Sequence, residues 1–480
     1  MNRLTYRFGP LERRGILGPV RAGQAAILGG GALLAILVLD SAPSAAGVAV
    51  SMLLVSLALV LAVAPVGHRT LEEWLPVLTA FALRRLGGRT HFRSWTPLQG
   101  FGARRRSAVA VPPALHGVEI RELEYRDRTV GALSERGGRW MTAVLACRVV
   151  AFSLLDAEAQ ERRLARWGVV LSSAAGTPVR RIQWIERTAP AQGDELARWL
   201  HAEHDPAVPL RGTPMIESYL ELIGSTARVT QEHEILVAVQ VDARREGAQA
   251  LLEQTERIAQ GLEAAEVKVL GALSAGQLSR ALRTAFDPYA RTELAALEAA
   301  DPERDGLAVE NAWPLGAREA WDHYQSDGAL HASYWIGAWP RVDVSPMFMD
   351  ALLGRSSCVR TVSVCFEPLP PDRSTRDVEA AVTRDRADRD LRRRFGQTDT
   401  ARQRQAEEAT MRRESELAAG HGEVRLAGFV TVSGRDVDDL RRSCGEVLEH
   451  AARARLELHR LYGQQAEAFT FTLPLGRGLR

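Results

Sequence analysis

The chain has 480 residues, of which 46% are hydrophobic and 25% are charged, and its formal net charge is +2. This length is enough for two or three domains, and the composition is that of an ordinary folded protein. The small net charge gives no strong field for nucleic acid, so direct nucleic acid binding is not expected. The four cysteines are scattered and form no C-x-x-C pair, which argues against a disulfide framework.

Two uncharged apolar runs near the N-terminus, residues 22–39 and 44–64, predict a membrane hairpin. Each run is close to the roughly 20 residues that a helix needs to cross a bilayer. The linker 40–44 is long enough only for a tight turn. A cleaved signal peptide would have one short apolar core, so two successive spans argue against that alternative. We therefore expect the protein in the inner (cytoplasmic) membrane, with two spans.

Arginine side chains flank the hairpin on both sides, whereas its turn carries only Asp40. The positive-inside rule therefore predicts that both termini, and everything after residue 67, are cytoplasmic. The flanking arginines are Arg3, Arg7, Arg13, Arg14 and Arg21 before the first span, and Arg69, Arg84, Arg85, Arg89, Arg93, Arg104, Arg105 and Arg106 after the second.

Two features near the hairpin predict helix contacts. Gly29, Gly30 and Gly31 in the first span allow another helix to approach closely. The second span of the same hairpin is the favoured neighbour, and a helix of another subunit is the alternative. Residues 70–86 place apolar side chains on one stripe, which predicts an amphipathic helix. It lies either at the membrane surface or in the core of the soluble part.

The rest of the chain is predicted to repeat one series of elements. Strand, helix, strand, helical insertion, strand, helix and strand follow one another in residues 107–303 and again in 308–480. This is the series of a split β-α-β, or ferredoxin-like, unit. The predicted fold class is therefore α+β, with an N-terminal transmembrane helical hairpin followed by two tandem ferredoxin-like cytoplasmic units with helical insertions.

Three domains follow from this series: residues 1–95 with the hairpin and the juxtamembrane helix, residues 96–303, and residues 304–480. In the last domain, residues 372–419 are dense in charges of both signs and contain a break at Gly396. This predicts two helices folded back on each other. Such helices usually form a solvated face, and a docking arm for another protein is the alternative.

The sequence contains no catalytic signature that we recognise. It has no G-x-x-x-x-G-K-[ST] phosphate loop, and its one lysine, Lys268, lies outside any glycine-rich run. Neither G-x-S-x-G nor H-E-x-x-H occurs. Two histidines in 201–205 have a spacing that can hold zinc, but a polar loop is favoured. The aromatic stretches 311–324 and 334–340 are favoured as core over a ligand site. We predict no catalytic, cofactor-binding or metal residues, no cofactor and no enzyme activity.

Four segments carry a resemblance to known families: YRFGPLERRGILG (6–18), LSRALRTAFDPY (278–289), LGRSSCVRTVSVCFEPLPP (353–371) and AFTFTLPLGRGL (468–479). With the hairpin in front, the chain resembles the PrgI-type and VirB-type two-span subunits of type IV secretion systems. Its cytoplasmic part resembles the amino-terminal domain of the CagE/TrbE/VirB traffic ATPases, in an actinobacterial arrangement that lacks the ATPase domain.

This resemblance implies a non-catalytic inner-membrane structural component of a type IV secretion or conjugation-like apparatus, one that anchors a separate cytoplasmic ATPase. The implied partners are the membrane, a separate Walker-A traffic ATPase, other secretion-channel subunits and further copies of the chain. Two alternatives remain open. One is a scaffold of another actinobacterial machine, such as a contractile injection system or another secretion type. The other is a membrane-bound enzyme of unknown chemistry.

We expect two segments to contact that ATPase: the charged insertion, 372–419, and the tail of the chain, 463–480. In the fused relatives, a segment of this kind leads directly into the nucleotide-binding domain. Phe469, Phe471 and Leu473 are the expected apolar anchors at the centre of the interface, with Arg477 and Arg480 at its rim. The alternative is that the tail completes the protein's own sheet. Phenylalanines two positions apart, at 469 and 471, are compatible with a strand or with the last turn of a helix.

Overall fold

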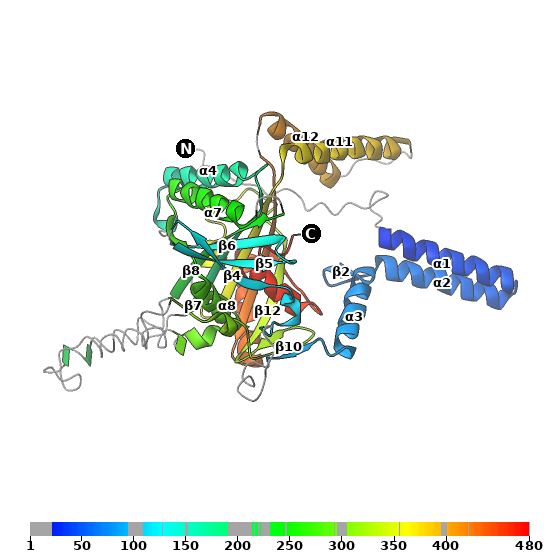
Figure 1. Ribbon diagram of the computed structural model, residues 1–480. Coiled ribbons are helices and arrows are strands. Elements are labelled where there is room, and N and C mark those ends of the chain that lie inside the picture. Colours follow the sequence, from blue (N-terminus) through cyan, green and yellow to red (C-terminus); the bar gives the residue numbers. More distant parts are fainter. Residues whose placement is uncertain are drawn as a thin grey trace. The chain divides into compact units, whose positions relative to one another are not determined.

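The computed structural model describes most of the chain (Figure 1). The described residues are 22–94, 109–190, 231–294, 305–394 and 401–479, without residues 127, 149–151, 245–246, 292, 355 and 421, together with a few positions between 214 and 221. They form two compact units. One contains the described residues of 91–377 and 413–480, and the other those of 9–90 and 378–412.

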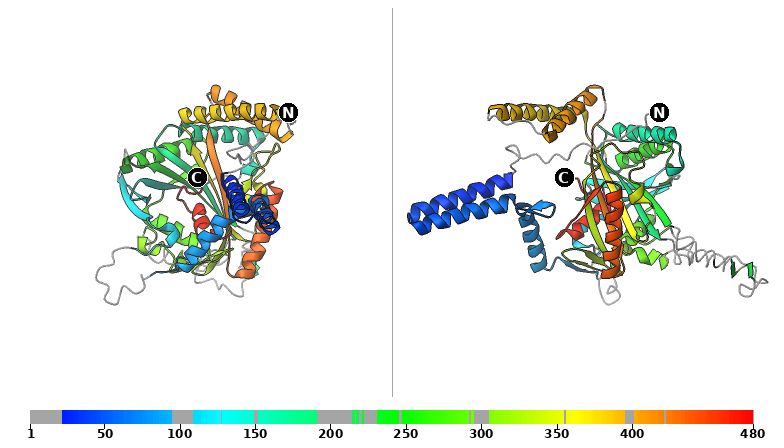
Figure 2. Two further views of the ribbon diagram at one scale, coloured as in Figure 1. Left: turned by 90° about the vertical axis from the view of Figure 1, so that its right-hand side faces the viewer. Right: turned by 180° about the vertical axis from the view of Figure 1, so that it is seen from behind.

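The two apolar runs form helices α1 (Ala22–Ser41) and α2 (Ala45–Val63), which lie side by side (Figures 1 and 2). Both are long and apolar enough to cross a membrane. The Ser44 hydroxyl caps α2 by accepting a hydrogen bond from the Gly47 backbone N–H at 3.2 Å. The predicted helical hairpin is therefore present in the structure.

The glycines of the first span face different surroundings. A Cβ atom added to Gly31 would lie 2.4 Å from the Cβ of Ala58, whereas Gly29 and Gly30 have nothing within 4 Å. Gly31 therefore lets α2 approach α1 closely, which confirms the second span as its neighbour. The Ser51 hydroxyl adds an interhelical hydrogen bond of 2.9 Å to the carbonyl oxygen of Ala35.

The predicted amphipathic helix is α3 (Leu71–Leu86), which follows the short strands β1 (Pro65–Val66) and β2 (Arg69–Thr70). At its N-terminus the Glu73 carboxylate accepts the backbone N–H of Thr70 at 3.0 Å. Val77 is buried, but four leucines of the helix are exposed: Leu75, Leu78, Leu83 and Leu86. An exposed apolar stripe of this kind agrees with the membrane-surface alternative, which stays a prediction.

The larger unit is built on one sheet of 13 strands, and every neighbouring pair is antiparallel. Its strands are β3 (His91–Arg93), β4 (Glu119–Tyr125), β5 (Arg128–Glu135), β6 (Trp140–Arg148), β7 (Val179–Pro190), β8 (Gln231–Asp242), β9 (Lys268–Ala272), β10 (Gly316–Glu319), β11 (Tyr324–Ser326), β12 (Ala329–Ala338), β13 (Val359–Pro368), β14 (Val424–Gly434) and β15 (Glu457–Arg460).

The same strand order occurs twice in this sheet. In the first half it is β9-β6-β8-β7, and in the second it is β15-β12-β14-β13. The halves join where β7 pairs with β13, in a register that places Ser363 opposite Ile185. The predicted domain boundary between residues 303 and 304 therefore falls between two halves that share one sheet. The analysis of the sequence missed β4 and β5, and also the short strands β10 and β11; these two pairs lie towards the two ends of the sheet.

Side chains along the central strands point alternately to the two faces of the sheet, and each face carries its own core. On β7, Ile182 packs with Val170 of α4 (Ala157–Ser173) and Ile258 of α7 (Gly247–Ala264), which lie side by side (Figure 1). Ile185 points to the other face and belongs to a second core, together with residues of α8 (Ala275–Phe286). Because successive side chains of a strand point to opposite sides, Arg181 and Gln183 also point to this second face.

The charged insertion forms helices α11 (Pro371–Arg394) and α12 (Ala401–Ala418), as predicted. Arg389 and Glu407 form an ion pair that joins them. In the second half, α10 (Asp350–Leu353) and α13 (Val437–Arg453) pack with β12 and β14 in a further core. The break predicted at Gly396 lies outside the described residues.

Candidate functional site: the C-terminal tail on the sheet

The tail is helical at its start and extended afterwards. Helix α14 spans Gln465–Phe469, and a 3-10 turn follows at Thr470–Thr472. The Thr472 hydroxyl donates to the carbonyl oxygen of Phe469 at 2.9 Å, which closes this turn. Phe469 and Phe471 therefore stand at the end of a helix, and the strand alternative is wrong. Residues 473–479 then cross the second face of the sheet without joining it as a strand.

The three predicted apolar anchors pack inside the protein. Phe469 is 2% exposed and Leu473 is 0% exposed, and both belong to the core of the second face. The Phe469 ring lies 5.1 Å from that of Phe286, measured between centroids. Phe471 is half-buried against Phe429, with centroids 4.7 Å apart. A partner could reach Phe469 and Leu473 only by displacing them from this core, and docking of an ATPase here stays a prediction.

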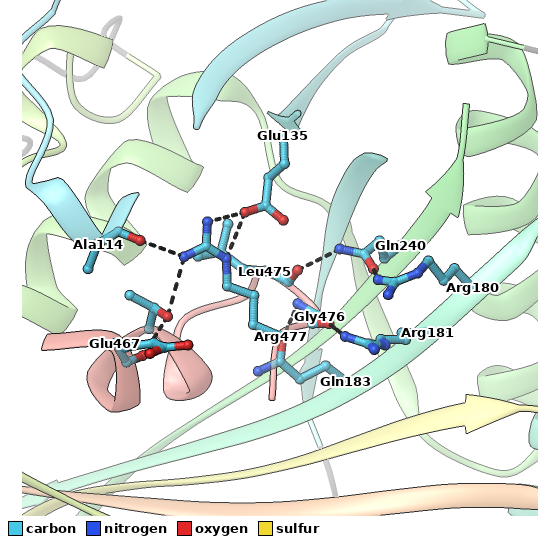
Figure 3. Close-up of polar contacts among 11 residues, drawn as sticks. Ala114, Glu135, Arg180, Arg181, Gln183, Gln240, Glu467, Leu475, Gly476 and Arg477 are labelled. Carbon is cyan, nitrogen blue, oxygen red and sulfur yellow. Dashed lines mark hydrogen bonds and ion pairs between the residues drawn. The ribbon is translucent and has the colours of Figure 1, made fainter. Parts of the chain in front are cut away.

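Gln183 of β7 holds the middle of the tail through the backbone (Figure 3). Its side-chain Nε2 donates to the carbonyl oxygens of Phe471 and Leu473, at 2.9 and 3.0 Å. Its Oε1 accepts the backbone N–H of Gly476 at 2.7 Å. The Gln183 side chain is fully buried, so these bonds satisfy a polar group that would otherwise be costly to bury.

Two further side chains hold the end of the tail. Nη1 and Nη2 of Arg181 donate to the carbonyl oxygens of Gly476 and Leu479, at 2.9 and 2.6 Å. Nε2 of Gln240 on β8 donates to the carbonyl oxygen of Leu475 at 2.7 Å. All these bonds reach backbone atoms. They therefore fix the path of the tail and leave its side chains free to fill the core.

Arg477, predicted at an interface rim, is anchored within the protein. Its Nε donates to Oε1 of Glu135 at 2.7 Å, and its Nη1 donates to the carbonyl oxygen of Ala114 at 2.8 Å (Figure 3). Glu135 is 3% exposed, so its carboxylate needs this guanidinium nearby. Arg480 lies outside the described residues.

A fully buried histidine lies against the tail. His331 of β12 shares hydrogen bonds with Ser326 and Ser433, at 2.9 and 2.8 Å, and its ring centroid is 4.7 Å from that of Phe469. Burial lowers the pKa of His331 from its ordinary value of 6.5 to about 4, although a contact with the carbonyl oxygen of Phe286 opposes this shift. The ring is therefore neutral at pH 7.

The described residues offer little for covalent or metal chemistry. Among them, no group of three or more His, Cys, Asp or Glu side chains is placed to hold a metal ion. The stretch 201–205 lies outside the described residues. All four cysteines are free and buried, and burial raises the pKa of Cys147 and of Cys365 to about 12. These two thiols are protonated at neutral pH, which is the unreactive form.

The aromatic stretches are placed mainly in the core. Trp313 is 5% exposed and lies edge-on to Phe286, with ring centroids 6.5 Å apart. Trp321 is partly exposed and stacks on Tyr462, at 6.4 Å between centroids. Sequence reasoning did not find the residues that hold the tail. Their signal is a polar residue inside an apolar strand, such as Gln183 in RRIQWIE or Gln240 in VAVQVDA.

One family model matches the chain. Residues 235–336 match EccE, described as the putative type VII ESX secretion system translocon protein EccE. The matched segment runs from β8 to β12 and thus crosses from the first half of the sheet into the second. No curated protein matches the chain.

This match overturns the resemblance to type IV secretion proteins. The type IV assignment, with its PrgI-type, VirB-type and conjugation functions, is wrong, because the matching family is a component of a type VII translocon. That resemblance rested on short segments and on a membrane hairpin followed by α/β elements, and only the segment 278–289 lies within the matched region. Such an architecture is shared by unrelated machines, so it does not identify one of them. The alternative of another secretion type fits better.

Replacing Leu473 by alanine tests whether the tail belongs to the core. We expect Leu473→Ala to lower the free energy of unfolding by about 2–5 kcal/mol, because the side chain is fully buried and its loss leaves a cavity. Denaturant unfolding of the full chain in detergent measures this. Leu154→Ala is the control: Leu154 is 82% exposed, and its loss should change stability by less than about 0.5 kcal/mol. Equal, small effects of both substitutions would contradict the core assignment.

The pKa of His331 predicts a pH dependence. Above pH 6.5 the ring is neutral in both states, and the full stability is present. As the pH falls from 6.5 towards 4, the unfolded chain binds a proton that the folded chain does not, so stability decreases. The contribution at stake is on the order of 3 kcal/mol.

The measurement is unfolding of the full chain at pH 7 and pH 5. His331→Gln should reduce the difference between the two pH values. His116→Gln, which replaces an exposed histidine, should leave the difference as in the original protein. An unchanged difference in His331→Gln would rule out His331 as its source.

Proposed function

We propose that this protein is a non-catalytic membrane component of a type VII (ESX) secretion translocon. The match of residues 235–336 to the EccE family model carries this proposal. Helices α1 and α2 support it, since a translocon component needs membrane spans and both helices are long and apolar enough to be such spans. Together, the family match and the two helices support a membrane location.

The proposal assigns the protein a structural role. The sequence has no phosphate loop, no nucleophile elbow and no H-E-x-x-H motif. The buried polar side chains of the tail region, such as Gln183 and Arg181, are occupied with tail backbone atoms. Polar side chains that are bonded to the protein's own backbone favour a structural role over a role in converting a substrate.

The proposed partners are other membrane subunits of the translocon and further copies of this chain. An ATPase is proposed among them, because transport needs an energy source and these 480 residues contain no phosphate loop. This ATPase would belong to a type VII system.

We further infer that each half of the sheet is a ferredoxin-like unit. The orders β9-β6-β8-β7 and β15-β12-β14-β13 support this inference. Numbered by their sequence within each half, both orders read 4-1-3-2, and all pairs are antiparallel. Helices α4 and α7 in the first half, and α10 and α13 in the second, supply the two crossovers of a split β-α-β unit.

Co-purification tests the proposed function. The tagged full chain, extracted from its native membranes with a mild detergent, should bring down other membrane subunits of a type VII translocon, identified by mass spectrometry. The same chain without residues 22–63 should lose them, because it lacks the proposed spans. Recovery of type IV channel subunits, or migration of the chain alone in native gels, would contradict the proposal.

The proposed topology places both termini in the cytoplasm and only the turn at 40–44 outside. The arginines that flank the hairpin support it. A cysteine introduced as Ser44→Cys should react in intact cells with a maleimide that cannot cross the bilayer. Ser357→Cys is the matched control: it is exposed on the α/β unit and should react only after the membrane is opened. If Ser357→Cys reacted in intact cells and Ser44→Cys reacted only after the membrane is opened, the topology would be the opposite of the proposed one.

A further inference from the structure

Arginine side chains gather around Trp140, next to the end of the tail. The guanidinium carbons of Arg136 and Arg180 lie 4.0 and 3.9 Å from the centroid of the Trp140 ring, and that of Arg139 lies 5.7 Å away. The turn between β5 and β6 creates this arrangement. Gly137 and Gly138 adopt positive φ angles of 66° and 88°, which tighten the turn and place Arg136 and Arg139 at its two ends.

These side chains belong to the face of the sheet that the tail covers. Trp140 pairs with Asp242, two residues beyond Gln240 on β8, so the two β8 side chains point to one face. Nη1 of Arg180 donates to Oε1 of Gln240 at 2.5 Å, and Figure 3 shows this contact beside the tail. Arg181, next to Arg180 on β7, adds a fourth positive charge, and Arg136, Arg139, Arg180 and Arg181 together are called the arginine cluster below.

The arginine cluster carries more positive charge than its neighbours neutralise. Two carboxylates of the described residues are ion-pair partners. Asp242 lies 3.8 Å from Nε of Arg139, and Glu367 lies 4.0 Å from Nη2 of Arg181. Nearby Glu135 is already paired with Arg477. Four positive charges against two negative ones leave an excess of two.

Arg180 experiences this excess most directly. Its hydrogen-bond partner is the neutral Gln240 amide, and no carboxylate of the described residues pairs with it. Burial lowers the pKa of Arg180 to about 10; the neighbouring charges of Arg181 and Arg136 add to the shift, and that of Glu367 opposes it. The side chain is still charged at neutral pH, and a nearby anion would stabilise this charge.

Three N–H groups of the cluster also lack acceptors. Nε1 of Trp140, Nε of Arg139 and Nε of Arg181 are buried, and no described residue accepts a hydrogen bond from them. Buried donors are normally paired, so an unpaired set in one place calls for an acceptor from outside the protein. By contrast, Nε2 of Gln183, which also faces the tail, has acceptors within the chain.

We propose that the arginine cluster binds a phosphate-type oxyanion. Guanidinium groups present flat forks of N–H donors that match phosphate oxygens, and contact with the indole ring holds them in place. An excess of two positive charges matches a phosphate monoester, whose charge at pH 7 is about −1.5 to −2, better than a single carboxylate. Free phosphate, a nucleotide and a phospholipid headgroup share this chemistry.

Calorimetric titration of the full chain with inorganic phosphate tests the site. The protein is kept in a neutral detergent, and ionic strength is held constant with chloride. We expect saturable binding that weakens on the order of tenfold or more in Arg136→Gln/Arg139→Gln, because two charged donors are lost.

The control is Arg441→Gln/Arg442→Gln, which removes the same charge from exposed positions of α13, where both arginines pair with neighbouring aspartates. It should bind phosphate as the original protein does. No saturable binding by the original protein, or an equal loss in both double variants, would overturn the proposal. The first outcome would leave the cluster as a packing arrangement around Trp140, and the second would indicate a general charge effect.

Arg180→Lys provides a second, milder test, since it keeps the positive charge but removes the planar fork. We expect weaker phosphate binding with an unchanged far-ultraviolet circular dichroism spectrum. Unchanged phosphate affinity in this variant and in the Arg136→Gln/Arg139→Gln variant would overturn the site. Titrations with glycerol phosphate and with adenosine triphosphate then identify the source, since tighter binding of one than of free phosphate indicates a headgroup or a nucleotide.

Discussion

The contact of Gln183 with the tail is the interaction on which the larger unit depends most. A fully buried amide in the middle of a sheet is stable only if its donors and acceptor are paired. Its partners Phe471, Leu473 and Gly476 lie almost 300 positions later in the chain, with a separation of 293 for Gly476. Without the tail, the Gln183 amide would lose these three backbone partners, and the apolar face around it would be uncovered. The tail is therefore the last layer of this core, and the sheet face is incomplete until the whole unit has folded.

The tail also joins the two halves of the sheet. Nε2 of Gln183, in the first half, donates to the Ser363 hydroxyl of the second half at 2.8 Å, diagonally across the β7–β13 pairing, because Ser363 lies opposite Ile185. Thr472 of the tail bonds Thr431 of β14 at 2.9 Å. One short segment thus bonds to β7 of the first half and to β14 of the second, which pairs with β13 next to the joint. Loss of the tail would weaken the joint between the halves as well as the core, which explains why its backbone is held so firmly.

The sequence was sufficient to predict the elements that have a strong local signal. Uncharged apolar runs predicted α1 and α2, and the alternation of strands and helices predicted the repeated series, because both signals depend on neighbouring residues. The positions of Phe469 and Arg477 were not predictable, since their partners Phe286 and Glu135 are far away in the chain. An apolar tail has the same composition whether it faces a partner or its own core. The strands β4, β5, β10 and β11 were also missed. In β4 the apolar pattern is weak, because its side chains are exposed or only partly buried.

Two groups of buried polar side chains lie at neighbouring places on one face of the sheet, and they differ in one physical respect. Around Gln183 every donor has an acceptor, and those acceptors are atoms of the tail and the adjacent strand. Around Trp140 the charges do not balance, and donors on Arg139 and Arg181 lack acceptors among the described residues. A polar network that serves only folding is expected to be complete within the chain, because each unpaired buried group reduces stability. The incomplete network is therefore the one whose missing part is expected to come from another molecule.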